Sequence, residues 1–290
     1  MSRIVFSNLH THTQFCDGQS TMEETAQAAV DAGMCVLGFS PHGPAEYDDV
    51  AMSTSSVPDF LAEIARLRKM FAGRLKILAG MEQDALAPTG SYGALAPASS
   101  HGAPVPAGSY GLDYTIGATH FIRDAFGRFH CLDHTQEKFA SAIESFGSVQ
   151  ATVMAYVDTY TAMLGAYWPL IAGHMDIITK LNAGNCFFNP CSEWYRKAEE
   201  TLANAVLRSG AVAEVNTAGM ARPGGQPYPG TNLLHRLLTL GVPVTLSSDA
   251  HHARDIVRFF PSAIDLLRDV GFSSVKIFGA NGFYDQALNF

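Results

Sequence analysis

Nine side chains that can bind divalent metal ions are spread along this chain. They are six imidazoles and three carboxylates, namely His10, His12, Asp17, His42, Glu82, His120, His174, Asp249 and His251. Imidazole nitrogens and carboxylate oxygens are common protein ligands of zinc, manganese and iron. The set has more donors than one tetrahedral ion can use, so the sequence predicts a site for more than one metal ion.

Neighbouring divalent ions suit the hydrolysis of phosphoesters. They deprotonate a bridging water near neutral pH, orient the phosphate for in-line attack by the resulting hydroxide, and neutralise charge as the ester bond breaks. Glu82 can bridge two ions because its carboxylate has two oxygens. We expect Glu82, Asp249 and His251 to act most directly in catalysis. The leaving alkoxide needs a proton donor, for which His251 and a metal-bound water both remain open.

Each of the nine residues lies at or just beyond the end of a short apolar run that is typical of a buried strand. These runs cover 4–9, 36–40, 75–79, 114–119, 170–173 and 242–248, and further strand candidates lie at 211–216 and 275–278. Amphipathic segments between them predict helices at 21–33, 57–72, 136–164 with a break near Gly147, 192–209, 230–240 and 253–270. This alternation predicts an α/β fold with a closed or nearly closed barrel, in which the C-terminal ends of the strands meet at one face and bring the ligands together.

Composition indicates a soluble protein with a sizeable core. The chain has 290 residues, of which 47% are hydrophobic and 16% charged, and we expect one domain over residues 1–290. No apolar run is long enough to span a bilayer, and the first residues show no secretory pattern, which favours a cytoplasmic location. The five cysteines include no CxxC pair and are unlike a disulfide framework, so reduced thiols are expected.

The charge of the chain bears on its partners. A formal net charge of −8 and a pI near 5.7 disfavour binding of extended nucleic acid. A local basic pocket for one phosphate is compatible with this balance, so we expect a small phosphomonoester as substrate and no membrane partner. The oligomeric state stays open at this point.

One segment departs from the alternating pattern. Residues 86–111 are dominated by Ala, Pro, Gly and Ser, which predicts a flexible insertion between the third and fourth strands. Because it follows Glu82 and precedes His120, it would emerge on the face where the ligands gather. A lid over the site and an ordinary solvent loop are both open interpretations, and His101 within it is expected to be exposed to solvent.

The ligand motifs, taken in chain order, resemble those of the polymerase and histidinol phosphatase (PHP) superfamily over nearly the whole chain. The resemblance implies a distorted (β/α)7 barrel with three divalent transition-metal ions (Zn, Mn or Fe, with mixed occupancy) at the strand C-terminal face. By position it assigns His10, His12, Glu82 and Asp249 to the first ion, Glu82, His120 and His174 to the second, and Asp17, His42 and His251 to the third.

Within that superfamily, the segment 214–219, Arg222 and Pro227-Tyr-Pro229 are similar to the histidinol-phosphatase branch. The resemblance implies hydrolysis of L-histidinol phosphate to L-histidinol and phosphate, a step of histidine biosynthesis. Arg222 would contact the phosphate, since a guanidinium fork matches its oxygens. Lys180 is the second expected phosphate contact, at a place where the family pattern suggests an arginine.

Two alternatives remain at this stage. One is another PHP-type phosphoesterase, a nucleotidase or phosphodiesterase, on a small substrate that the sequence does not identify. The other is a non-catalytic metal-binding module, which the full set of nine ligand positions disfavours. The remaining histidines His130, His134, His235 and His252 match no ligand position and are expected at the surface or in supporting roles.

Overall fold

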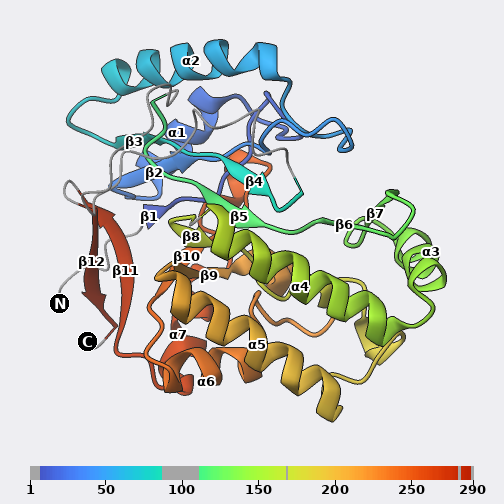
Figure 1. The fold of residues 1–290 in the computed structure, drawn as a ribbon. Helices are drawn as coiled ribbons and strands as arrows, with labels where there is room; N and C mark the ends of the chain where they lie inside the picture. Colours follow the sequence, from blue (N-terminus) through green and yellow to red (C-terminus); the bar gives the residue numbers. More distant parts are fainter. Residues whose placement is uncertain (1–6, 87–110, 168, 280–281, 289–290) are drawn as a thin grey trace.

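Two sets of parallel strands form the centre of the molecule (Figure 1). The structure is a computed structural model that describes residues 7–86, 111–167, 169–279 and 282–288. One sheet has the order β1-β2-β3, with bounds Ser7–Asn8, Val36–Phe39 and Lys76–Ala79. The other has the order β10-β9-β8-β5-β4, with bounds Val244–Ser247, Val212–Asn216, Ile171–Ala172, Ile116–Ala118 and Glu82–Asp84. The predicted α/β class with parallel strands is confirmed.

The two sheets meet at both of their edges. The chain passes from β3 in one sheet to β4 in the other through Gly80 and Met81. Beyond the ends of β2 and β1, isolated parallel bridges pair His42 with Glu82 and Thr11 with Ala250. The segments that carry predicted ligands therefore lie next to one another although they belong to different sheets.

The space between the sheets is filled around Tyr114, which is fully buried. Its hydroxyl donates to the backbone oxygen of Leu9. A Cβ at Gly38 would lie 2.1 Å from the Tyr114 hydroxyl oxygen, and a Cβ at Gly80 would lie 2.1 Å from its ring. Both positions must be glycine for the ring to fit, and Gly80 is also where the chain changes sheets.

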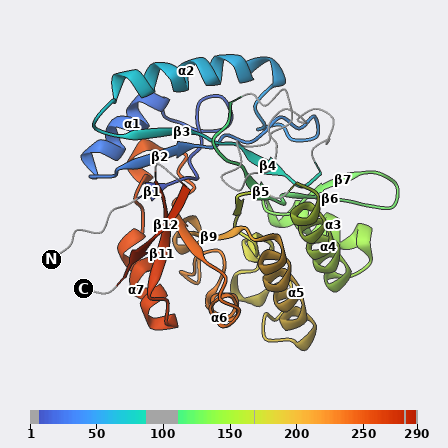
Figure 2. The ribbon, with the colours of Figure 1, turned by 60° about the vertical axis from the view of Figure 1, so that its left-hand side comes forward.

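Helices cover the outer faces of both sheets (Figures 1 and 2). The helices are α1 Met22–Asp31, α2 Val57–Met70, α3 Gln136–Phe146, α4 Val149–Tyr167, α5 Glu193–Ser209, α6 Thr231–Thr239 and α7 Phe260–Val270. Helices α1 and α2 lie over the three-stranded sheet, and α4 to α7 lie on the side of the five-stranded sheet. Each group buries its own apolar cluster, around Phe39 and Phe60 in the first case and around Tyr156 and Leu233 in the second.

Local signals in the sequence set several helix ends. Thr21 and Glu24 form a capping box at the start of α1. Gly147, at φ 83°, separates α3 from α4 and confirms the predicted break. The short 3₁₀ turns are Thr54–Ser56 (η1), Ile177–Thr179 (η2), Ala183–Asn185 (η3), Thr217–Ala221 (η4) and Ala253–Asp255 (η5).

The predicted helix 253–270 was wrong over its first part. Helix α7 begins only at Phe260, because Phe259 has φ 59°, a left-handed conformation that interrupts a helix, and Pro261 suits a first turn. Glu82 lies just beyond the end of β3, as expected, and it is also the first residue of β4, a strand of the other sheet that was not predicted.

Two antiparallel hairpins complete the fold. They are β6 (Phe121–Arg123) with β7 (Phe129–Cys131), and β11 (Ser274–Gly279) with β12 (Gly282–Ala287). Of these four strands only β11 was predicted, as 275–278. The predicted insertion 86–111, with His101, lies outside the described residues apart from its first and last positions, as do residues 4–6 of the first predicted strand. Among the residues that the structure describes, no helix has the length and apolarity needed to cross a membrane.

Candidate metal centre

The structure brings all nine predicted ligand residues into one cluster. They come from the segments after β1 (His10, His12, Asp17), β2 (His42), β5 (His120), β8 (His174) and β10 (Asp249, His251), and from the start of β4 (Glu82). The cluster lies where the C-terminal ends of the parallel strands meet, and these six segments converge there from two sheets.

Glu82 lies at the centre of the cluster, with 1% of its surface exposed. Its Oε1 is 2.8 Å from His174 Nε2 and 3.0 Å from His120 Nε2. Its Oε2 is 3.0 Å from His42 Nδ1 and 3.2 Å from His10 Nε2. Oε2 also lies 3.6 Å from His12 Nε2, so each carboxylate oxygen faces at least two imidazoles, an arrangement that suits a bridging carboxylate.

Asp249 forms one side of the cluster. Its Oδ1 lies 2.8 Å from His12 Nε2 and 3.6 Å from His10 Nε2. Its backbone has φ 53°, a left-handed conformation that Asp tolerates better than most residues and that occurs just after β10. The side-chain amide of Asn216, at the end of β9, donates to Asp249 Oδ2 at 3.0 Å and fixes the carboxylate. Asn216 had no predicted role.

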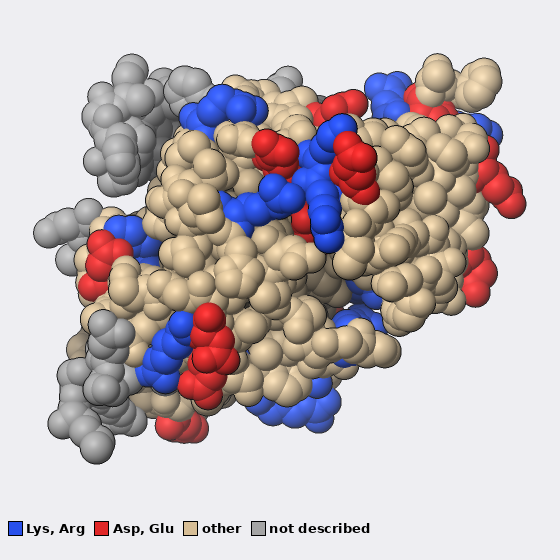
Figure 3. All heavy atoms as spheres, turned by 90° about the horizontal axis from the view of Figure 1, so that it is seen from below, with Lys and Arg blue, Asp and Glu red and all other residues tan. Residues whose placement is uncertain are grey.

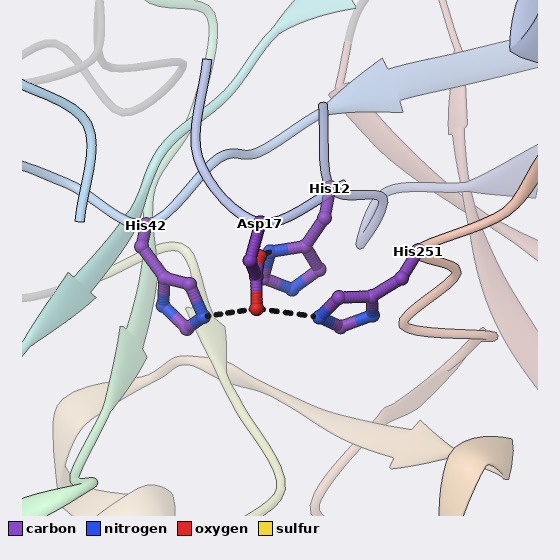
Figure 4. A group of neighbouring side chains, drawn as sticks. All are labelled: His12, Asp17, His42 and His251. Atoms are coloured by element: carbon purple, nitrogen blue, oxygen red, sulfur yellow. Dashed lines mark hydrogen bonds and ion pairs between the residues drawn. The ribbon is translucent and has the colours of Figure 1, made fainter. Parts of the chain in front are cut away.

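Asp17 organises the opposite side, where it lies among His12, His42 and His251 (Figure 4). Its Oδ2 is 3.1 Å from His251 Nε2 and 4.0 Å from His42 Nε2, and its Oδ1 is 3.2 Å from His12 Nδ1. The rings of His12 and His251 stack with centroids 4.0 Å apart. Three segments far apart in the sequence therefore meet at one carboxylate.

The donor set fits divalent metal ions. The buried atoms His10 Nε2, Glu82 Oε2, Asp17 Oδ1 and Asp249 Oδ1 have no hydrogen-bond partner, although buried polar atoms in proteins are almost always paired. Groups of ligand atoms within 4.8 Å of one another are His12, Asp17, His42 and His251; His10, Glu82 and His174; His10, His12 and Asp249; and His42, Glu82 and His120. Residues that belong to two of these groups, such as Glu82, are placed to bind two neighbouring ions.

Electrostatics in the cluster favour a cation. Burial alone would lower the pKa of His10, but the carboxylates of Glu214, Asp249 and Glu82 outweigh burial and hold that pKa well above its usual value. Burial alone would raise the pKa of Glu82, whereas His10, His42 and His120 keep it well below its usual value. The buried carboxylates are therefore anionic and attract positive charge, so protons and divalent ions compete for the same ring nitrogens.

Glu214, on β9, is a functional residue that sequence reasoning did not assign. It is fully buried, and its Oε1 lies 2.6 Å from His10 Nδ1 while its Oε2 accepts the backbone N–H of His174 at 2.7 Å. The hydroxyl of Ser247 donates to the same carboxylate. Glu214 thus orients His10 so that Nε2 faces the cluster. The sequence signal that could have indicated this role is a carboxylate inside the otherwise apolar run 211–216.

Asp133 is a second unassigned residue, and it joins a ligand to a predicted substrate contact. Its Oδ2 lies 3.5 Å from His120 Nδ1 and 2.8 Å from Lys180 Nζ. Burial would raise the pKa of Asp133, but Lys180 and His120 hold it well below its usual value. The ammonium of Lys180 is thereby fixed beside the cluster. No feature of the sequence around Asp133 predicts this role.

A cavity of about 420 Å³ opens over the cluster, within the range of small-molecule sites. Arg222 and Lys180, the two predicted phosphate contacts, both line it, together with Tyr47 and Phe121. Arg222 is exposed and follows η4. On the face shown in Figure 3, Lys and Arg lie beside Asp and Glu among uncharged residues. The cavity wall, by contrast, holds both Arg222 and Lys180.

Comparison with known proteins places the chain in a family. A model of the PHP domain matches residues 8–218, so the chain belongs to the PHP family. It is similar to the histidinol-phosphatase of Bacillus subtilis, with 28% identity over 85% of this chain and 94% of that protein. It is also 28% identical to a probable histidinol-phosphatase of Deinococcus radiodurans, over 90% of this chain and 92% of the relative.

Solved structures show the same fold. A putative histidinol phosphatase of Listeria monocytogenes superposes with a TM-score of 0.74 at 20% identity, covering 89% of this chain and 99% of the other. Histidinol phosphate phosphatase of Lactococcus lactis superposes with a TM-score of 0.71 at 16% identity, covering 96% and 98%. The latter structure is a complex with zinc, L-histidinol and phosphate. The α/β architecture is thus that of PHP proteins.

Proposed function

We propose that the protein is a metal-dependent phosphomonoesterase that hydrolyses L-histidinol phosphate to L-histidinol and phosphate. One observation carries the proposal: the buried cluster around Glu82 opens into a cavity whose wall holds Arg222 and Lys180. Metal ligands and phosphate-binding cations on one cavity are what phosphoester hydrolysis needs. The similarity to histidinol-phosphatases supports the choice of substrate.

The proposal includes three divalent ions, with Zn, Mn or Fe as occupants. Adjoining ligand groups that share His10, His12, His42 and Glu82 support several neighbouring ions. When bound, such ions supply an activated water near neutral pH and stabilise charge on the phosphate. We also propose that the two sheets and the bridges between them form one distorted (β/α)7 barrel in a single domain over 1–290.

The protein's own residues then have distinct tasks. Arg222 and Lys180 hold the phosphate over the cluster, Lys180 from a position fixed by Asp133. Asp249 holds the His12 ring in place, and Glu82 holds the His42 ring. His251 Nε2 faces Asp17 and its Nδ1 faces the backbone oxygen of Asp249, so both ring nitrogens have partners. This arrangement favours His251 as a metal ligand over a proton donor.

The substrate assignment is tested by a turnover screen. Purified protein loaded with Mn²⁺ or Zn²⁺ is assayed with L-histidinol phosphate, several mononucleotides, a phosphodiester and an aryl phosphate. We expect kcat/KM for L-histidinol phosphate to exceed that for every other compound by at least about tenfold, which corresponds to about 1.4 kcal/mol. If the protein prefers a nucleotide or a diester, that compound becomes the proposed substrate in place of L-histidinol phosphate. If it hydrolyses no ester, the alternative of a non-catalytic metal-binding module is favoured.

A further inference from the structure

A second cavity adjoins the metal cavity. Its volume is about 460 Å³, within the range of small-molecule sites. Lys180 and Arg222 line both cavities and so form a shared wall. The second cavity extends from this wall toward α5 and the loop before α6, and it holds none of the nine metal ligands. A substrate whose phosphate contacts Lys180 and Arg222 could place another group here.

Two buried acids of this cavity each have one carboxylate oxygen without a hydrogen-bond partner. Asp176 is 4% exposed and Glu199 is 5% exposed, and both line the cavity. Asp176 Oδ2 accepts the backbone N–H of Gly230 at 2.8 Å, but Asp176 Oδ1 and Glu199 Oε2 have no donor. Leaving a buried acceptor unpaired destabilises the folded protein, and more so when the group is charged. Two such atoms beside one cavity indicate that donors come from a ligand.

The neighbouring basic groups do not supply these donors. Arg236 Nε lies 3.6 Å from Glu199 Oε2, which is an ion pair beyond hydrogen-bond distance, and Lys180 is bonded to Asp133 instead. In the part of the chain that the structure describes, no ion pair involves Asp176. Of these two acids, Asp176 is therefore the one without a basic partner among the described residues.

Aromatic rings complete the wall. Tyr195 and Tyr228 are both buried and line the cavity together with Asp176 and Glu199. Carboxylates accept charge-assisted hydrogen bonds from an ammonium or imidazolium, and the faces of aromatic rings attract the same cations. An anionic or neutral apolar ligand would leave the two carboxylate oxygens unpaired.

We propose that this cavity binds the ammonium-bearing organic part of the substrate, with Asp176 as the main acceptor and Glu199 as a second one. Lys180 and Arg222 on the shared wall then contact the phosphate of the same molecule. The identity of the ligand rests on the proposed function, because L-histidinol carries an ammonium next to the carbon that bears the ester. Asp176 and Glu199 thereby determine specificity for aminated phosphomonoesters.

The test measures binding, so it does not depend on turnover. L-Histidinol, and its analogue without the amino group, 3-(imidazol-4-yl)propan-1-ol, are titrated calorimetrically into Mn-loaded protein. Asp176→Asn keeps the shape and removes the charge, and Glu199→Gln does the same at the second acid. Glu200→Gln is the matched control, since Glu200 is the next residue of α5 and is exposed. Circular dichroism and metal content confirm that each variant is folded and loaded.

We expect wild-type protein to bind L-histidinol more tightly than the analogue. Asp176→Asn should weaken L-histidinol binding at least about tenfold, or about 1.4 kcal/mol, and leave analogue binding unchanged. Glu199→Gln should have the same effect to a smaller extent, because Arg236 already offsets its charge, and Glu200→Gln should have none.

The inference is overturned if wild-type protein does not prefer L-histidinol to the analogue, or if folded Asp176→Asn binds L-histidinol as wild type does. Turnover of L-histidinol phosphate is measured separately. If the wild-type protein hydrolyses L-histidinol phosphate but Asp176→Asn binds L-histidinol as wild type does, the proposed cation site is wrong and the proposed function stands. If L-histidinol binding depends on Asp176 but the wild-type protein hydrolyses no ester, the cation site stands and the proposed function is wrong.

Discussion

Replacing Glu214 by Gln tests how His10 is oriented while all nine predicted metal ligands stay in place. In the native protein the two oxygens of Glu214 face His10 Nδ1, the backbone N–H of His174, the Ser247 hydroxyl and, at 3.3 Å, the Asn216 amide. All four are donor positions if His10 carries its proton on Nδ1. That tautomer leaves Nε2 free to bind a metal ion beside Glu82.

A Gln side chain has the same shape but only one acceptor oxygen. If its NH₂ group faces His10, the imidazole proton must move to Nε2, the nitrogen that binds metal. If the NH₂ group faces His174, two buried donors meet and one is unsatisfied, at a cost of about 1–3 kcal/mol. Loss of such supporting contacts typically lowers metal affinity or activity by about 10–100-fold, equivalent to about 1.4–2.8 kcal/mol.

The assay is a metal titration of stripped protein, followed by phosphate release and by elemental analysis after dialysis. Ser247→Ala is the control, because it removes one donor and keeps the carboxylate. We expect Glu214→Gln to need about 10–100-fold more free metal for half-maximal turnover. Ser247→Ala should stay within a few-fold of wild type. A folded Glu214→Gln protein with wild-type metal affinity would show that Glu214 does not set the ligand state of His10.

Further expected outcomes concern the phosphate contact, the ligands and the metal. Arg222→Ala should lower kcat/KM for the best phosphomonoester by about 10–100-fold with unchanged metal content, because a charge-assisted contact contributes about 1.5–3 kcal/mol. Arg222→Lys should restore part of the loss, since lysine keeps the charge but not the guanidinium fork. Wild-type kinetics in Arg222→Ala would show that Arg222 does not bind the phosphate. His42→Ala should reduce turnover by orders of magnitude while the protein stays folded and retains the first two ions, which elemental analysis would report as a partial loss of metal; loss of all metal would contradict the proposed division of ligands. Chelation should lower Tm in differential scanning fluorimetry, since an ion at 100 times its Kd adds about 2.7 kcal/mol of stability; an unchanged Tm would mean that the cluster binds no ion tightly.

The convergence of the ligands could be predicted because it depends on chain order alone. Alternating apolar strands and amphipathic helices imply parallel strands, and parallel strands put residues such as His42, His120 and His174 at one end. Nothing about side-chain packing is needed for that step. The break at Gly147 and the cap at Thr21 were predictable for a similar reason, since both are local.

Other features depend on contacts that the sequence does not encode locally. Glu214 lies 204 residues from His10, so only the folded chain shows that they are partners. Residues 75–84 form two strands in different sheets that are joined at Gly80, which packs against the buried Tyr114, and a hydrophobic pattern cannot show that change of sheet. The start of α7 depends on the backbone of Phe259, which an aromatic residue does not signal. The acids of the second cavity look like ordinary helix and loop residues until their burial is known.

The most direct test of the central claim is reversible metal dependence of L-histidinol phosphate hydrolysis. Protein is stripped with a chelator, reloaded in steps with Mn²⁺ or Zn²⁺, and analysed at each step for bound metal and for phosphate released. We predict that turnover is lost on stripping and returns as metal content rises above one ion per chain, since nine ligands exceed what one ion can use. Turnover that persists in stripped protein, or a metal content that never exceeds one ion per chain, would contradict a multinuclear metal-dependent phosphatase.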